Sequence, residues 1–340
     1  MMGETGRSGT AVRGHRRWIW GGVAAVAVCA ILLGALGSAL AAPSPAAKVV
    51  TGTATSFATG KGPDRMAYNP VNHDLYVPDQ SASVVQIFNS TNARVATVHL
   101  PVDSYPSAAA FYPRNNGVYV TAQGANVVFV ITGTKLTHTI SSSFFNSPYG
   151  IVYDPGDAAM IVANDGGNTV TAIVGTTAAY TIPVGSNPFE IAYDPYYSTL
   201  VVTNFYSANI TILDAVYLTH IGSEPVGTEP TGVAYDPVNQ RVYVANFGSD
   251  NVTVTDGYLS QVGTLGGLSN PDGIAFSQAS LEIYITNVHT GKVFVYNSAD
   301  KLVAKYSTTA KANPVDATYD EYNDLVYVSG YYVAKVFVVP

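Results

Sequence analysis

The sequence predicts an all-β fold, a seven-bladed β-propeller built from four-stranded blades. A proline recurs along the chain at steps of 43, 42, 40, 42, 41 and 43 residues, and an aromatic residue follows each of these prolines by five positions. Each repeat also contains several short β-rich runs. A period of about 40 to 45 residues with several short strands is the signature of a propeller blade. The seven anchor prolines are Pro63, Pro106, Pro148, Pro188, Pro230, Pro271 and Pro314.

Each repeat is predicted to form four strands in a fixed order. The inner strand follows the anchor proline and carries a hydrophobic, a small and an aromatic residue, as in Val233-Ala234-Tyr235. The small residue is expected because inner strands converge on the propeller axis. An Asp-Pro or Asn-Pro turn follows in most repeats. In the repeat that begins at Pro230, the second strand is expected at residues 243–246 and the outer strand at residues 259–265. The third strand is expected at residues 251–254, where polar and apolar residues alternate with period two.

The two ends of the propeller are predicted to complete one blade together. The seventh repeat stops at Pro340, directly after its third strand at residues 335–339. A spare strand lies near the beginning of the repeat region, at about residues 49–57. We expect this N-terminal strand to become the outer strand of the C-terminal blade. Such ring closure would hide a sheet edge that is otherwise open.

The chain before the propeller is predicted to direct export. Residues 1–17 form a basic head, expected to be cytoplasmic, and residues 18–42 form an uncharged apolar segment. Residues 43–48 are a Pro/Ala spacer, and the propeller occupies residues 49–340. The apolar segment is long enough to cross a bilayer as one hydrophobic helix, and it also ends in Ala39-Leu40-Ala41, a pattern that signal peptidase cuts.

A signal peptide and a retained signal-anchor transmembrane helix therefore both remain open. Both place the propeller outside the cytoplasm, either secreted or anchored at the cell surface with the N-terminus inside. If the segment is not cleaved, it holds the protein in the membrane.

Composition and charge argue against a nucleic-acid partner. Charged residues make up 11% of the chain, against about 25% in an average soluble protein. After the first 41 residues the chain carries 12 basic and 22 acidic side chains, a net charge of −10. Nucleic-acid binding requires the opposite sign. The one cysteine, Cys29, lies in the apolar segment, so the propeller has no disulfide.

The repeated residues resemble those of the YVTN-repeat β-propellers. The family is named for a Tyr-Val-Thr-Asn run, which appears here at residues 243–246, 201–204 and 284–287 with small variations. Three repeats depart at its last position, with Asp79, Ala122 and Gly330. The resemblance implies a seven-bladed propeller on an exported protein, often of bacterial or archaeal surface layers. It also implies a more distant similarity to propeller lactonases and streptogramin-lyase-like enzymes. It carries no catalytic residue with it.

Two repeated features are interpreted as parts of the architecture. An asparagine lies sixteen positions after the anchor proline in four repeats, where its side chain is expected to cap the next turn. The aromatic residue five positions after the proline is expected to fill the space between blades. The four asparagines are Asn164, Asn204, Asn246 and Asn287.

The residues directly after each anchor proline vary between repeats and are the candidate binding site. They enter the inner strand near one mouth of the central channel, where propellers bind ligands. Four acids, one arginine and two aromatic residues converge there. One hypothesis is that they form a polar binding site for a cation such as Ca²⁺ or for a small ligand. The other is that they line a solvated channel entrance in which Asp64 and Arg65 partly neutralise each other. The candidate residues are Asp64, Arg65, Tyr149, Phe189, Glu190, Asp272 and Asp316.

The sequence offers no catalytic constellation and no metal-ligand pattern. The histidines lack spacings such as His-x-His, there is no Gly-x-Ser-x-Gly elbow, and the repeats contain no cysteine nucleophile. We therefore expect a non-enzymatic binding, interaction or surface-structural module. Its expected partner is an envelope or surface protein, or a glycan. The alternative is a lactonase-like hydrolase or lyase that uses the acidic channel mouth.

Three Asn-x-Ser/Thr sequons are candidate glycosylation sites in an exported protein. Two of them share one repeat register, so their Asn-x-Thr pattern also suits the start of a strand. The three candidate asparagines are Asn89, Asn209 and Asn251.

Overall fold

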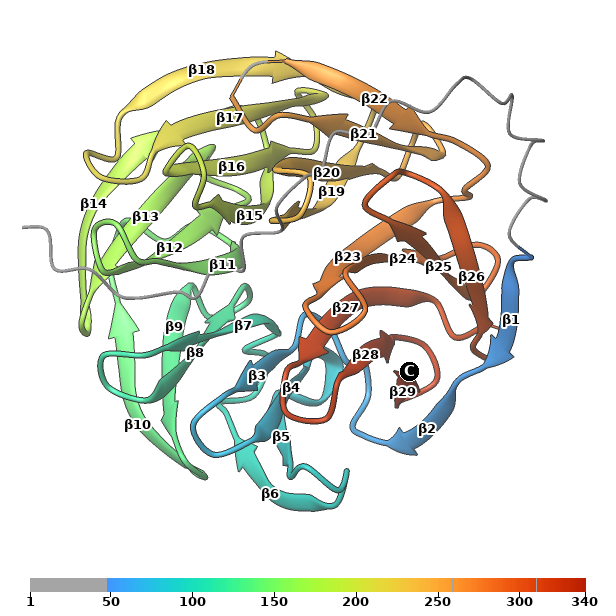
Figure 1. Ribbon diagram of the computed structural model, residues 1–340. Coiled ribbons are helices and arrows are strands. Elements are labelled where there is room, and N and C mark those ends of the chain that lie inside the picture. The colour runs from blue at the N-terminus through green and yellow to red at the C-terminus, as the bar shows by residue number, and fades with distance from the viewer. Residues whose placement is uncertain (1–47, 259, 310) are drawn as a thin grey trace, which may run out of the picture. The chain divides into compact units, whose positions relative to one another are not determined.

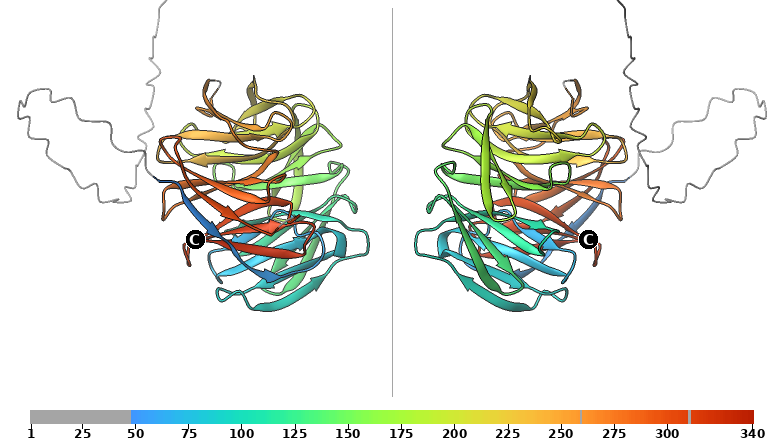
Figure 2. Two further views of the ribbon diagram at one scale, coloured as in Figure 1. Left: turned by 90° about the vertical axis from the view of Figure 1, so that its right-hand side faces the viewer. Right: turned by 90° about the vertical axis from the view of Figure 1, so that its left-hand side faces the viewer.

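The computed structural model describes residues 48–258, 260–309 and 311–340, which form seven sheets arranged as the blades of a propeller (Figure 1). The fold class predicted from the repeats is confirmed. In six blades the strands follow one another outward from the axis in chain order, and the seventh takes its outer strand from the N-terminal side. Side views show the blades stacked around a common axis (Figure 2).

The first four blades have the following strands. Blade 1 contains β3 (Ala67–Asn69), β4 (Asp74–Asp79), β5 (Val84–Phe88) and β6 (Arg94–His99). Blade 2 contains β7 (Pro106–Tyr112), β8 (Gly117–Ala122), β9 (Val127–Thr132) and β10 (Lys135–Ser141). Blade 3 contains β11 (Pro148–Asp154), β12 (Ala159–Asn164), β13 (Thr169–Val174) and β14 (Thr177–Pro183). Blade 4 contains β15 (Pro188–Asp194), β16 (Thr199–Asn204), β17 (Asn209–Asp214) and β18 (His220–Pro225).

The remaining three blades complete the ring. Blade 5 contains β19 (Pro230–Asp236), β20 (Arg241–Asn246), β21 (Asn251–Thr255) and β22 (Gln261–Leu265). Blade 6 contains β23 (Pro271–Ser277), β24 (Glu282–Asn287), β25 (Lys292–Asn297) and β26 (Leu302–Ser307), with β1 (Val50–Thr53) beside β26. Blade 7 contains β27 (Pro314–Asp320), β28 (Leu325–Gly330), β29 (Lys335–Val339) and β2 (Thr55–Ala58).

The hydrophobic core lies between neighbouring blades rather than inside one layer. The second strands, such as β12 and β16, are buried at all six of their residues, because both faces of a blade pack against its neighbours. This two-sided burial explains why their sequences are continuously apolar rather than alternating. Outer strands such as β10 are mostly exposed, and their sequences are correspondingly richer in polar residues.

Ring closure is confirmed, but one detail of the prediction was wrong. The N-terminal stretch forms two strands rather than one. β2 pairs antiparallel with β29 and completes blade 7 as expected, whereas β1 pairs parallel with β26 and adds a fifth strand to blade 6. Phe57 on β2 packs against Phe88 of blade 1, with ring centroids 4.6 Å apart, and against Tyr327 of blade 7 at 6.1 Å. The N-terminal stretch therefore joins three blades.

Asn164, Asn204 and Asn246 have the architectural role that was expected of the repeated asparagines, whereas Asn287 instead accepts a hydrogen bond from the amide of Ser269 at 2.6 Å. The side-chain amide of Asn204 donates hydrogen bonds to Asn209 at 2.9 Å and to Thr211 at 2.9 Å on the next strand. Asn246 makes the same pair of contacts one blade later, to Asn251 at 2.8 Å and Thr253 at 2.9 Å. The asparagine thus fixes the turn between the second and third strands.

The repeated aromatic residues fill the gaps between blades, as predicted. Phe111, Tyr153 and Tyr193 are partly buried, and each packs against a different core cluster. Neighbouring inner strands also approach closely two positions after the proline. A Cβ at Gly232 would stand 2.1 Å from the carbonyl oxygen of Asp272, so only glycine fits there.

The predicted basic head, the hydrophobic helix and residues 43–47 of the spacer lie outside the described residues. Within residues 48–258, 260–309 and 311–340, no helix is long and apolar enough to span a bilayer.

Candidate functional site

The anchor prolines mark one face of the ring, which we call the proline face, because the inner strands of blades 2 to 7 begin there. The turns that follow the second strands lie on the same face. The amide of Tyr331 donates to the carbonyl oxygen of Asn313, just before an anchor proline, at 3.2 Å, and Phe205 donates to Asn187 in the same way at 2.9 Å. The proline face therefore combines two sets of loops around the channel mouth.

Blade 1 departs from the other blades at this face. Its inner strand β3 has only three residues, whereas the inner strands of the other blades have seven. Pro63 and Asp64 still pair with the second strand of blade 1, where the amide of Asp64 donates to Pro78 at 3.0 Å. Arg65 pairs with blade 2: its amide donates to Ser107 at 3.1 Å, and Ala109 donates back to it at 3.1 Å. From this position the side chain of Arg65 extends across the channel to blades 3, 4 and 6.

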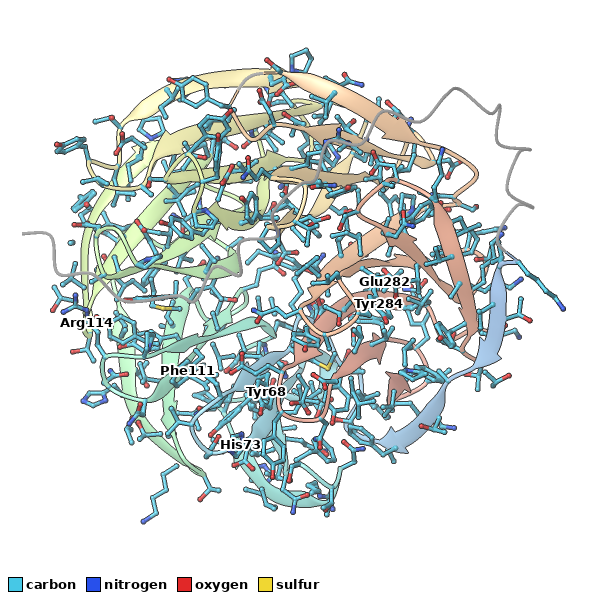
Figure 3. The ribbon with its side chains drawn as sticks, in the orientation of Figure 1. Tyr68, His73, Phe111, Arg114, Glu282 and Tyr284 are labelled. Carbon is cyan, nitrogen blue, oxygen red and sulfur yellow. The ribbon has the colours of Figure 1, made fainter. Side chains whose placement is uncertain are left out.

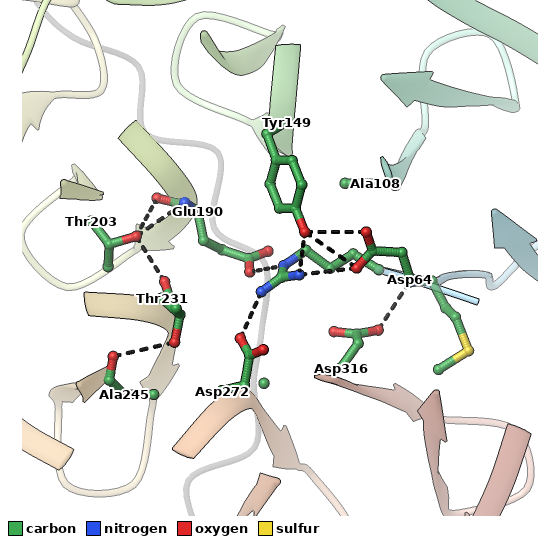
Figure 4. A network of polar contacts seen from close by, with 12 residues as sticks. Asp64, Ala108, Tyr149, Glu190, Thr203, Thr231, Ala245, Asp272 and Asp316 are labelled. Atoms are coloured by element: carbon green, nitrogen blue, oxygen red, sulfur yellow. Dashed lines mark hydrogen bonds and ion pairs between the residues drawn. The ribbon is translucent and has the colours of Figure 1, made fainter. Parts of the chain in front are cut away.

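The guanidinium of Arg65 contacts side chains from blades 3, 4 and 6 in addition to its own neighbour Asp64. It donates to Glu190 at 2.5 Å, to Asp272 at 2.9 Å, to Tyr149 at 3.0 Å and to Asp64 at 3.1 Å. Figure 4 shows these four partners converging on the guanidinium; Tyr149, Glu190 and Asp272 lie on separate strands, and Asp64 directly precedes Arg65. Arg65 and Asp64 are 3% and 2% exposed, so this ion-pair network is buried. Arg65 therefore ties four blades together at the axis.

Aromatic rings enclose one side of the guanidinium. Its central carbon lies 4.7 Å from the ring centroid of Phe189 and 5.1 Å from that of Tyr149. The two rings stack on each other with centroids 4.4 Å apart. This arrangement combines cation–π attraction with hydrogen bonding. The variable aromatic residues of blades 3 and 4 thus position the arginine.

Backbone contacts hold the acidic residues in place. The hydroxyl of Thr203 accepts a hydrogen bond from the amide of Glu190 at 3.0 Å and donates to the carbonyl of Thr231 in the next blade at 2.7 Å (Figure 4). Asp316 of blade 7 accepts from the amide of Met66 at 2.9 Å. The threonine of the repeated second-strand motif therefore links neighbouring inner strands at the mouth.

Burial raises the pKa values of three of the acids. It raises the pKa of Asp64 and that of Asp272 to about 6, although Arg65 pulls both in the opposite direction. Burial and the nearby Glu190 raise the pKa of Asp316 to about 7. One guanidinium does not compensate four carboxylates, so the site favours either protons or an added cation.

A cavity of about 190 Å³ opens directly above this network on the proline face. Asp64, Arg65, Tyr149 and Asp272 form its floor and wall. Val315, which directly follows an anchor proline, also lines it, and its other lining residues were missed in the sequence: Gln80, Asn313, Tyr331 and Tyr332. Gln80, Tyr331 and Tyr332 lie in the turns after second strands, seventeen and eighteen positions after the anchor proline. The residues at these two positions also vary between repeats, and this variation could have identified Gln80, Tyr331 and Tyr332 as candidates.

The structure brings all seven candidate residues to one mouth. Arg65 supplies the guanidinium, and five of the other candidates contact it directly. Asp316 instead accepts a hydrogen bond from the amide of Met66, the residue after Arg65. Among the described residues, no group of three His, Cys, Asp or Glu side chains is arranged to hold a metal ion. The Ca²⁺ hypothesis therefore stays a prediction.

The sequons also stay predictions. The side-chain oxygens of Asn209 and Asn251 accept the hydrogen bonds from the repeated asparagines, which is the strand-start role considered for them. The side-chain oxygen of Asn89 accepts from the amides of Thr91 at 3.1 Å and Ala93 at 3.0 Å within its own turn.

The opposite end of the channel is bordered by the repeated aromatic residues. A cavity of about 360 Å³ is lined there by Tyr68, Phe111 and Tyr319, with Glu321 as its one charged side chain. Figure 3 shows Tyr68 and Phe111 on the neighbouring first and second blades. The lining of this cavity has one charged side chain, whereas the channel-mouth cavity has three.

No protein-family model matches the chain, and no curated protein matches it. Solved structures share its fold. Virginiamycin B lyase from Staphylococcus aureus is 14% identical, with a TM-score of 0.74, covering 85% of this chain and 99% of its own. A streptogramin B lyase is 13% identical, with a TM-score of 0.73, over 84% and 96% of the two chains. Kuenenia stuttgartiensis hydrazine synthase is 19% identical, with a TM-score of 0.72, over 82% and 95%. These similarities establish the propeller fold alone.

Proposed function

We propose that this protein is an exported, non-enzymatic binding module of the cell surface, which captures a cationic group of its partner at the proline face. The observation that carries the proposal is the buried convergence of four carboxylates around one guanidinium beneath an open cavity. The partner is an envelope or surface protein, or a glycan. Export rests on the basic head and apolar segment, and surface-layer association rests on the YVTN resemblance.

The charge balance of the mouth supports a cation rather than an anion as the ligand. Arg65 already donates to four partners, which leaves little donor capacity for an incoming anion. The carboxylates, by contrast, exceed the positive charge. A protonated amine in the cavity would compensate this excess and would lower the pKa values of Asp64 and Asp272. Ca²⁺ is a competing occupant with the same attraction to carboxylates.

The proposal predicts that cation binding strengthens as pH rises. Asp64 and Asp272 titrate at about 6 and Asp316 at about 7, so the site gains negative charge between pH 5 and pH 8. Calorimetric titration with ethylammonium at pH 5, 6, 7 and 8 should show an affinity that increases by about tenfold or more and then levels off. Near pH 6 binding should release protons, seen as a binding enthalpy that depends on the buffer.

Ca²⁺ is titrated in parallel, and Asp272→Asn serves as the variant that weakens the site. Binding of ethylammonium that is independent of pH, or that Asp272→Asn leaves unchanged, would remove the channel mouth as the binding site. No heat from ethylammonium or Ca²⁺ at any of these pH values would contradict the proposal as a whole.

A hydrolase or lyase that uses the acidic mouth is the second candidate. The observation that favours it is the presence of carboxyl groups with pKa values of about 6 to 7 at the cavity, because such groups exchange protons near neutral pH. Turnover of lactones and of virginiamycin B is the direct assay. Turnover that is lost in Asp64→Asn and Asp316→Asn would replace the binding function with the enzymatic one.

A further inference from the structure

Two larger cavities on the proline face flank the channel-mouth cavity and share lining residues with it. One, of about 420 Å³, lies toward blade 6 and is lined by His289, Thr290 and Lys311. The other, of about 390 Å³, lies toward blade 1 and is lined by Lys61 and Ser81. Tyr332 lines all three cavities. Each flanking cavity reaches the size at which proteins hold small ligands, so the mouth is the centre of an extended groove.

Tyr332 is a highly exposed aromatic residue of this groove. Its side chain is 73% exposed, and its ring packs edge-on against Tyr331, with centroids 5.4 Å apart. Tyr331 in turn donates a hydrogen bond to Gln80 of blade 1. Tyr332 therefore offers an open aromatic face, and its position is supported by Tyr331, which is itself held by Gln80. Such a face suits stacking against the C–H face of a sugar ring or against a cation.

The remaining lining residues indicate a hydroxyl-rich ligand. The two flanking cavities and the mouth expose amide and hydroxyl side chains from Asn270, Thr290, Asn313, Ser81 and Gln80. A peptide recognised through its backbone would need a free strand edge, but the proline face presents turns to the groove. Hydrogen-bonding side chains around an exposed aromatic ring instead match a saccharide.

The charges indicate where on that saccharide an amine belongs. Asp64 and Asp272 line the mouth, whereas Lys311 and Lys61 line the outer cavities. Like charges in the outer cavities disfavour a chain that carries positive charge along its length. The favoured ligand has one cationic group at its end and neutral units behind it.

We propose that the proline face binds an oligosaccharide that ends in an amino sugar with a free amine. The amine binds in the channel-mouth cavity, above the Arg65 guanidinium and its partners Asp64 and Asp272, and the following neutral unit stacks on Tyr332. This ligand class rests on the proposed function, because it assigns the cationic group that the mouth captures to a glycan. It adds Tyr332 and the flanking cavities as the elements that select the chain.

The test compares three ligands by calorimetric titration of the full chain at pH 7.5. They are ethylammonium, fully N-acetylated chitotriose, and chitotriose deacetylated only at its non-reducing end. The mono-deacetylated trisaccharide should bind at least about tenfold more tightly than either of the others. Tyr332→Ala should weaken it about tenfold, and Tyr332→Phe should retain its binding. Asp272→Asn should abolish the preference for the free amine.

Tyr206 provides the matched control. It occupies the same repeat register in blade 4 and is 74% exposed, but it lines none of the three cavities. Tyr206→Ala should therefore leave trisaccharide binding unchanged, and an equal loss in both variants would overturn the assignment of Tyr332.

Binding of ethylammonium together with unchanged trisaccharide binding in Tyr332→Ala would overturn the glycan inference and leave the proposed function standing. Tighter binding of an amine-ended Gly-Ser-Asn tripeptide would assign the groove to a protein partner. Absence of binding by every ligand would contradict both proposals.

Discussion

At the scale of single residues, Arg65 is the side chain on which the channel mouth depends. It is the one cation among four carboxylates, and its donors reach three other blades. Removing one partner from a buried ion pair costs far more than breaking a surface pair, because it leaves uncompensated charge in a region of low dielectric. Arg65 therefore combines a structural role with control of the charge of the site.

Arg65→Ala should lower the free energy of unfolding by about 3 to 5 kcal/mol at pH 8. The loss should be smaller at pH 5, where Asp64, Asp272 and Asp316 hold protons and no longer need the guanidinium. Chemical denaturation at the two pH values measures both effects. Arg241→Ala is the control, since the Arg241–Asp300 pair joins side chains that are 36% and 24% exposed, and its loss should cost only about 0 to 1 kcal/mol. Equal losses in the two variants would refute the buried network.

At the scale of elements, the N-terminal strand β2 closes the ring by pairing with β29. It supplies the outer strand of blade 7, and Phe57 extends from it to blades 1 and 7. β1 has a different role, because it lies parallel to an already complete blade and three of its four residues are exposed. The two strands are adjacent in the sequence but should differ in their contribution to stability.

Phe57→Ala should lower the free energy of unfolding by about 2 to 4 kcal/mol, because a partly buried ring is lost from the junction of blades 1 and 7. Val50→Ala on β1 is the control, since Val50 is 57% exposed and should change stability by less than about 0.5 kcal/mol. Thermal and denaturant unfolding provide the measurement.

Removal of residues 48–58 should produce an aggregating protein, because it uncovers the edges of β29 and β26. A monomeric product that still unfolds cooperatively would contradict this closure.

At the scale of the whole molecule, acidic groups from several blades make stability depend on pH. The folded-state pKa values of Asp64, Asp272 and Asp316 lie above the ordinary value of 3.8. Asp79, which accepts hydrogen bonds from Thr59 and Gly60, is raised by burial to about 7. Between about pH 4 and pH 7 these groups hold protons in the folded protein that the unfolded chain has released. Their contribution to stability is therefore complete below pH 4 and is lost as pH rises through 6 to 7.

The contribution of these four acids to the free energy of unfolding should consequently decrease from pH 4 to pH 8. Asp316→Asn should flatten this decrease by up to a few kcal/mol, since each unit of pKa difference corresponds to about 1.4 kcal/mol. Denaturation curves measured at unit pH intervals test this. Asp103→Asn changes an exposed turn residue and should keep the wild-type slope. A wild-type profile that Asp316→Asn does not alter would remove the buried acid as the cause.

Much of the fold could be predicted because each blade repeats the same local signals. The anchor proline, the turn after the inner strand and the buried second strand recur with nearly constant spacing. Each blade buries its faces only against its neighbours, so the pattern of one repeat implies the presence of the others. The convergence of Asp64, Arg65, Tyr149, Glu190 and Asp272 on one mouth followed from their shared register. Their variation between repeats distinguished them from the architectural residues.

Other features depended on which blades become neighbours across the closed ring. Tyr206 and Tyr332 share a register and an exposure, yet only Tyr332 borders the channel-mouth cavity. The backbone of Arg65 pairs with Ala108 of blade 2, whereas Pro63 just before it pairs with Asp79 of its own blade, and no local sequence pattern predicts this change of partner. Repeat spacing is encoded in contacts close along the chain, whereas the mouth is built from side chains more than 200 residues apart, such as Arg65 and Asp272. Their distances exist only once the ring has closed.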